Sequence, residues 1–159
     1  MTTIRTGDLL HSRSSRMFGS IIRLATAPLK TIKGKWVPNH TAIAVQDDGL
    51  LWAYESIAFK GAHRVPFTEW VRKHKDYRVT PMPLSGYRCR LKTVLNSYLG
   101  TGYERWWSLL LVPFNRAKRT AKRLFCTEYV IVALQKSGFP YAPVCAASTM
   151  DPDELYRAY

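Results

Sequence analysis

The chain has 159 residues, enough for one domain with a sizeable core, and 47% of them are hydrophobic, which excludes a wholly disordered protein. Its 24 Lys and Arg outnumber 11 Asp and Glu, so the formal net charge is +13, and this balance predicts an anionic partner or substrate. No CxxC pair and an odd number of cysteines argue against a disulfide framework and a zinc finger; the cysteines are Cys89, Cys126 and Cys145. We expect no metal and no cofactor.

Targeting signals are absent from the sequence pattern. The N-terminus lacks the apolar core of a secretory signal, and the longest apolar run, Leu109 to Phe114, is far shorter than a bilayer span. We therefore expect a cytoplasmic protein, for which action at the cell envelope requires another delivery route. Residues 1–159 are interpreted as one domain, because the chain has no internal repeat and no low-complexity linker. The sequence does not indicate an oligomeric state.

The first part of the chain predicts a short strand, a helix and a hairpin. Leu9 and Leu10 follow a turn as a short strand, and apolar residues at helical spacing predict a helix from Ser15 to about Ala27. Two strands, Asn39–Val45 and Leu50–Ile57, flank a turn signal and predict an antiparallel hairpin.

The next region predicts a short helix and a third strand. Thr68 is expected to cap a helix that reaches about Lys75, with Trp70 and Val71 on its buried side. The segment Tyr77–Met82 is typical of a strand that ends at prolines.

The C-terminal half predicts helices. Apolar stripes indicate helices over Arg90–Leu99 and Phe125–Lys136, ended by Gly100 and Gly138, and Asp153–Tyr159 predicts a short helix or turn. The order of strand, helix, antiparallel strands and helices is typical of an α+β fold.

Cys126 is the candidate nucleophile. If a helix begins there, its thiol lies over unpaired backbone N–H groups at the positive end of the helix dipole, and both favour the thiolate. Five basic residues directly before it act in the same direction: Arg116, Lys118, Arg119, Lys122 and Arg123. Apolar spacing also allows a helix that begins at Asn115, in which Cys126 would be a small core residue without this benefit.

A thiolate nucleophile needs a nearby base, and His40 is the candidate. It starts a strand of small residues, where an imidazole could face a neighbouring helix, although a lone His there is also compatible with a structural role. His63 and His74 lie in charged surroundings typical of the surface.

The register of the hairpin decides whether a carboxylate accompanies His40. A four-residue loop places Glu55 directly opposite His40, and a two-residue turn places it one diagonal away on the same face. A three-residue loop puts Tyr54 or Ser56 there instead, and Glu55 then faces solvent. Two of the three registers thus predict a His–carboxylate pair, which would fix the imidazole tautomer and stabilise its charged form.

Several short motifs occur in a characteristic order: GDLL at 7–10, NHTAI at 39–43, YES at 54–56 and FCTEYV at 125–130. Residues 102–104 and 150–155 add stretches similar to a Gly-x-x-Tyr-Asp and a closing Pro-x-x-Leu motif. Together, over about residues 7–156, they resemble the circularly permuted NlpC/P60 (papain-like) group, in its YiiX/YaeF-type branch. Thr127 stands where Ser is more usual in that group, and the stretch 104–125 is longer than typical.

The resemblance implies a circularly permuted papain-like fold, with an antiparallel sheet packed against helices, and a thiol hydrolase or acyltransferase site. In it Cys126 is the nucleophile and an oxyanion donor through its backbone N–H, His40 is the general base and acid, and Glu55 orients His40. Neighbouring residues expected to bind substrate are Tyr54, Tyr103 and Thr127.

The leading hypothesis is a cysteine amidase or peptidase that forms a thioester acyl-enzyme, with peptidoglycan peptides as the substrate suggested by the resemblance. An alternative is a lipid or ester hydrolase or acyltransferase at an anionic membrane, using the apolar stretch Trp106, Trp107, Leu109–Leu111 and Phe114. A third is a non-catalytic basic domain that binds nucleic acid, although no nucleic-acid motif supports it. We expect an anionic substrate, either a wall peptide or a lipid surface, and no specific nucleic acid.

Overall fold

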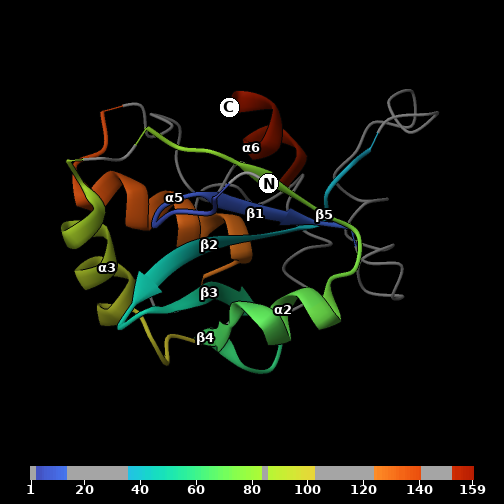
Figure 1. Cartoon of the computed structure of the whole chain (residues 1–159), viewed down its shortest axis with the longest axis horizontal. Helices are drawn as coiled ribbons and strands as arrows, with labels where there is room; N and C mark the ends of the chain where they lie inside the picture. Colours follow the sequence, from blue (N-terminus) through green and yellow to red (C-terminus); the bar gives the residue numbers. More distant parts are fainter. Residues whose placement is uncertain (1–2, 14–35, 84–85, 103–123, 141–151) are drawn as a thin grey trace, which may run out of the picture.

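The computed structural model describes residues 3–13, 36–83, 86–102, 124–140 and 152–159. Five antiparallel strands form one sheet in the order β4-β3-β2-β1-β5 (Figure 1). The strands are β1 (Leu9–Ser12), β2 (His40–Asp47), β3 (Leu50–Ile57), β4 (Gly61–Pro66) and β5 (Tyr77–Thr80). The helices of the described residues are α2 (Phe67–Lys73), α3 (Arg88–Ser97), α5 (Cys126–Ser137) and α6 (Pro152–Ala158). The predicted α+β class and antiparallel sheet are confirmed.

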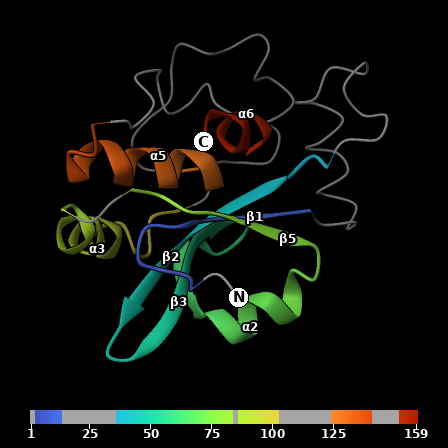
Figure 2. The ribbon, with the colours of Figure 1, turned by 45° about the horizontal axis from the view of Figure 1, so that its top comes forward.

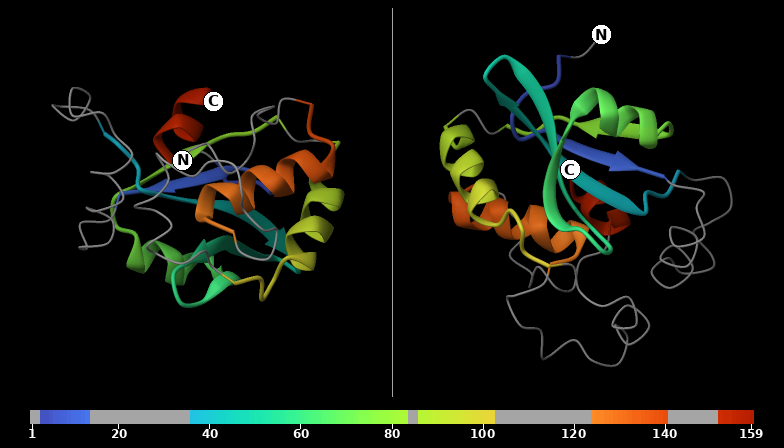
Figure 3. Two further views of the ribbon diagram at one scale, coloured as in Figure 1. Left: turned by 180° about the vertical axis from the view of Figure 1, so that it is seen from behind. Right: turned by 90° about the horizontal axis from the view of Figure 1, so that it is seen from below.

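Side chains that alternate along the strands build two hydrophobic clusters, one on each face of the sheet. Leu9, Ile43 and Tyr54 belong to the cluster that includes the apolar residues of α3 and α5. Leu10 belongs to the other cluster, where α2 contributes Trp70. Figure 2 shows the sheet between α2 on one side and α5 with α6 on the other, and Figure 3 shows α3 and α5 side by side.

A two-residue turn joins β2 to β3 and selects one of the three registers. Asp48 and Gly49 form it with φ values of 48° and 76°, which is the left-handed conformation that such hairpin turns require. The strand pairing that follows from this turn places Glu55 on the same face as His40, one diagonal away.

Two features between β3 and β5 differ from the sequence prediction. β4 is not predicted, because its segment has no clear apolar alternation, and it is recruited as an edge strand by pairing with β3. The expected cap at Thr68 is wrong: the cap residue is Pro66, two residues earlier, so α2 begins at Phe67, and it has no side-chain cap hydrogen bond. Pro66 has a φ of −54°, a value that the proline ring fixes and that suits a helix entrance.

Gly61 lies where β4 passes close to the backbone of Thr101. A Cβ on Gly61 would overlap the Thr101 carbonyl oxygen, which already accepts a hydrogen bond of 2.7 Å from the Ala62 N–H. The φ of Gly61 is +72°, so a side chain there is strained as well. We expect Gly61→Ala to lower the free energy of unfolding by about 2–3 kcal/mol.

Gly49→Ala is the matched control, because Gly49 has a similar φ of +76° but a Cβ there meets no atom within 4 Å. Its expected loss is about 1 kcal/mol, the cost of the left-handed conformation alone. Denaturant unfolding of both variants measures the difference, and equal losses would rule out the steric explanation.

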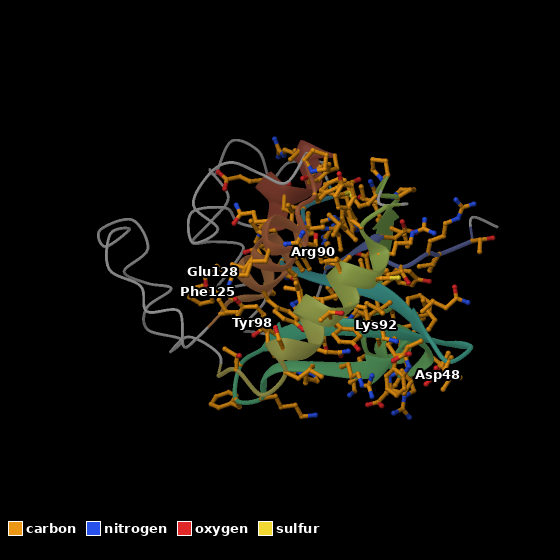
Figure 4. The ribbon with its side chains drawn as sticks, turned by 90° about the vertical axis from the view of Figure 1, so that its left-hand side faces the viewer. Asp48, Arg90, Lys92, Tyr98, Phe125 and Glu128 are labelled. Carbon is orange, nitrogen blue, oxygen red and sulfur yellow. The ribbon has the colours of Figure 1, made fainter. Side chains whose placement is uncertain are left out.

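α5 begins at Cys126, which decides between the two helix starts considered above. Phe125 is extended, with φ −70° and ψ 168°, so no helix from Asn115 runs continuously through it. The Glu128 carboxylate accepts a hydrogen bond of 2.8 Å from the Phe125 N–H and closes the first turn (Figure 4). Gly138 ends the helix with a φ of 82°, as predicted.

Other sequence predictions fall on residues that the structure does not describe. These are the helix over 15–27, the apolar run 106–114 and the basic run 116–123. Among the helices that are described, none is long and apolar enough to cross a membrane.

Candidate active site

Three elements bring the predicted site residues together. His40 is the first residue of β2, Glu55 lies near the end of β3 and Cys126 is the first residue of α5. The Nε2 atom of His40 donates a hydrogen bond of 2.7 Å to Glu55 Oε2. The side chains are 12% and 4% exposed, so water competes little for this contact.

The side chain of Cys126 also interacts with His40. Because Nε2 faces Glu55, Nδ1 is the ring nitrogen that remains for the sulfur. Burial opposes a charge on His40, but the hydrogen bonds with Cys126 and Glu55, together with their charges, raise its pKa from 6.5 to about 10. The ring is therefore cationic at neutral pH and bridges a sulfur and a carboxylate.

Glu55 is the centre of the polar cluster. Besides His40, it accepts hydrogen bonds from Trp70 Nε1 at 2.9 Å and His63 Nε2 at 3.3 Å, and His74 Nε2 lies 3.8 Å away. Burial alone would raise the pKa of the Glu55 carboxyl, but the hydrogen bonds from His40 and His63 and the nearby imidazole charges hold it well below its ordinary value. Glu55 is thus a buried carboxylate with every oxygen engaged.

A stack of rings fixes the position of His40 from the side of α2. The Trp70 and His74 rings are stacked with centroids 4.5 Å apart, and His74 stacks in turn on His40 at 5.3 Å. The Nδ1 atom of His74 is hydrogen-bonded to Ser12 Oγ at 2.9 Å, so its Nε2 is the atom that faces Glu55. This stack restricts how the His40 ring can turn.

His63, His74 and Trp70 are the members of the site that sequence reasoning missed. The surface assignment of both histidines is wrong, since their side chains are only 19% and 17% exposed and both face Glu55. His63 pairs directly with Glu55 across β3 and β4, a contact hidden because β4 was not predicted. The spacing of Trp70 and His74 was a usable signal, because residues four apart share one helix face.

The residues predicted to bind substrate lie in different surroundings. Tyr54 is fully buried, and its hydroxyl donates to Asn96 Oδ1 at 2.8 Å on the face of the sheet opposite Glu55. Thr127 is buried in the first turn of α5. Tyr103 lies outside the described residues. Their roles toward a substrate remain predictions.

A subset of the site has the arrangement of a metal-binding group. His40, Glu55 and His74 each offer one ligand atom, and these atoms all lie within 4.8 Å of one another. Cys126 is not part of this group; it is a free thiol, as is the exposed Cys89.

His11 is a fourth histidine close to the site, with a different character. It is fully buried, its Nδ1 is 3.1 Å from Thr41 Oγ1, and its Nε2 has no hydrogen-bond partner in the described part of the chain. Burial, and secondarily the charge of His40, lowers the pKa of His11 from 6.5 to about 3. The imidazole is neutral in the folded protein.

This lowered pKa predicts acid sensitivity. Between pH 6.5 and 3 the unfolded chain binds a proton at His11 that the folded protein does not, so stability is complete above pH 6.5 and falls as the pH drops. We expect urea midpoints to decrease from pH 7 to 5, and His11→Gln to flatten this decrease. His63→Gln should instead steepen it, because the raised pKa of His63 stabilises the folded protein in acid. An identical pH slope in wild type and His11→Gln would contradict this assignment.

Comparison with known proteins finds a related fold. The chain resembles the crystal structure titled metalloprotein yiiX from Escherichia coli O157:H7, DUF1105, with a TM-score of 0.62 and 19% sequence identity, over 86% of this chain and 67% of that chain. No protein-family model and no curated protein matches the sequence. The neighbour agrees with the branch that the motifs resemble, and at this identity it establishes a shared fold only.

Proposed function

We propose that this protein is a cysteine-dependent hydrolase of amide or related acyl bonds, built on a circularly permuted papain-like domain over residues 1–159. The observation that carries the proposal is the position of His40, whose ring hydrogen-bonds with Glu55 and whose pKa is raised by the neighbouring side chain of Cys126. Nucleophilic acyl transfer requires a thiol, an imidazole that accepts its proton and a carboxylate that orients the imidazole.

In the proposed reaction, the Cys126 proton resides on His40 and the sulfur attacks the carbonyl carbon of the substrate. The carbonyl oxygen gains negative charge beside the backbone N–H of Cys126 at the start of α5. His40 then gives its proton to the leaving nitrogen as the carbon–nitrogen bond breaks, which leaves a thioester on Cys126. Water attacks the thioester, His40 takes the water proton, and the acid and the thiol are released.

The substrate class follows from charge and from the motif resemblance. The net charge of +13 suits an anionic substrate, and peptidoglycan peptides are the acyl substrates to which the resemblance points. The apolar stretch on which the lipid alternative rests lies outside the described residues.

A chromogenic ester tests the proposal directly. After brief incubation, mass spectrometry should find the acyl group on Cys126, and Cys126→Ala should abolish both this adduct and ester turnover. Cys89→Ser is the matched control, because Cys89 is an exposed free thiol on α3, and it should acylate at Cys126 like the wild type. Acylation spread over exposed thiols, or turnover that survives Cys126→Ala, would overturn the proposal.

A second candidate is a metal-dependent activity at His40, Glu55 and His74, favoured by the proximity of their ligand atoms and by the description of the fold neighbour as a metalloprotein. A chelator separates the two candidates. A metal-dependent activity is lost on chelation, whereas acylation of Cys126 persists.

A further inference from the structure

We propose that His40, Glu55 and His74 bind a zinc-type divalent cation, and that the bound ion switches the thiol site off. The binding half of this proposal stands on the geometry of the three side chains. The regulatory half rests on the proposed cysteine hydrolase function.

The donor set and its spacing suit such an ion. Two imidazole nitrogens and one carboxylate oxygen are a ligand combination that zinc takes when a fourth position stays open. The His40 and His74 Nε2 atoms lie 2.7 Å and 3.8 Å from Glu55 Oε2, and all three ligand atoms fall within 4.8 Å. Ligands of a tetrahedral zinc are roughly 3.3 Å apart, given bonds of about 2.0–2.1 Å, so small side-chain shifts suffice.

The outer nitrogen of the His74 imidazole is already held. His74 Nδ1 is hydrogen-bonded to Ser12 Oγ at 2.9 Å. Such outer contacts orient histidine ligands and fix which nitrogen meets the metal. The two rings are stacked within 15° of parallel, so a shared ion requires them to tilt toward each other.

Occupancy by the ion is incompatible with the role of His40 as a base. The cation takes the Nε2 lone pair, the Nε2 proton leaves to solvent, and the remaining ring hydrogen must sit on Nδ1. The ring then has no lone pair with which to take a proton from Cys126 or from water. Glu55 is engaged by the ion at the same time and no longer accepts the Nε2–H.

Equilibrium zinc binding tests the first half, measured by competition with a chromophoric chelator. Wild type should bind one ion per chain, and His74→Gln should weaken binding roughly 100-fold or more, since even loss of a supporting partner costs 10–100-fold. Glu69→Gln is the matched control, because Glu69 is an exposed carboxylate on α2 that lies outside the three-ligand group, and its affinity should stay within about 3-fold of wild type. Equal affinity of wild type and His74→Gln would overturn the site.

Cobalt in the wild-type protein gives a readout that does not depend on a variant folding. We expect an absorption spectrum of nitrogen and oxygen ligands without a thiolate charge-transfer band, and Cys126→Ser should leave it unchanged. A thiolate band that Cys126→Ser removes would place the ion on the sulfur and contradict the proposal.

Inhibition separates this inference from the proposed function. Zinc should slow acylation of Cys126 by the chromogenic ester, and chelation should restore the rate. In His74→Gln, the zinc concentration for half-inhibition should rise by about the same factor as the loss of zinc affinity. Each protein is compared with its own metal-free rate. Metal-free acylation without zinc binding defeats only the metal inference. Zinc binding without any acylation of Cys126 defeats the proposed function and, with it, the regulatory half.

Discussion

Replacing Glu55 with alanine is expected to lower the free energy of unfolding by about 3–5 kcal/mol at pH 7, the range found when one partner of a buried ion pair is removed. Glu55 accepts hydrogen bonds from His40, from His63 and from the fully buried Trp70. Its loss leaves the indole N–H without an acceptor and removes the carboxylate that pairs with the His40 charge. Both consequences cost free energy because neither group reaches water freely.

The pH dependence of this loss has a definite sign. The folded-state pKa of Glu55 is held below its ordinary value of 4.5, so its contribution is complete above pH 4.5 and is lost as the pH falls. The gap between wild type and Glu55→Ala should therefore narrow in acid. Glu69→Ala is the matched control, since Glu69 is an exposed carboxylate paired with Lys73, and its expected loss is below about 1 kcal/mol. Similar urea midpoints for the two variants would show that Glu55 is not the centre of the cluster.

Replacing His40 with glutamine is expected to slow acylation of Cys126 by roughly 10²–10⁴-fold, the range that a positioned general base contributes. Glutamine can hydrogen-bond with Glu55 but cannot hold the thiol proton or return it to a leaving group. The rate should be measured by single-turnover acylation with the chromogenic ester, so that deacylation does not mask the effect.

His63→Gln provides the comparison for this rate. It removes an imidazole that contacts the other Glu55 oxygen, and no interaction between His63 and Cys126 appears in the described structure. Its acylation rate should fall far less than that of His40→Gln. Equal rates in the two variants would mean that contact with Glu55, rather than proton transfer to Cys126, sets the reactivity.

The parts of the site carried by local patterns could be predicted from the sequence. The hairpin turn signal at Asp48 and Gly49 limits the register to a few choices, and two of them place Glu55 near His40. The strand β2 and the helix that contains Cys126 follow from apolar spacing and glycine stops. The start of α5 could not be predicted, because the apolar spacing runs through Phe125 and only its extended backbone breaks the helix.

The remainder of the site depends on contacts distant in sequence. His63 reaches Glu55 only because β4 pairs with β3, and β4 has little strand pattern of its own. His74 follows the end of a short helix that is placed by the burial of Trp70 against the sheet. Charged residues next to both histidines in the sequence predict that the two side chains are exposed. The tertiary contacts bury most of each side chain instead.

The pH dependence of alkylation at Cys126 is the most direct test of the central claim, with exposed Cys89 in the same molecule as the reference. Because the pKa of His40 is raised to about 10 by its contacts with Cys126 and Glu55, the imidazolium persists beside the sulfur through the neutral range. The account predicts that at pH 6 a small alkylating reagent labels Cys126 at least about 10-fold faster than Cys89, despite burial of Cys126, and that His40→Gln removes this advantage. Labelling of both thiols only above about pH 8, where unperturbed thiols ionise, with Cys126 the slower, would contradict it.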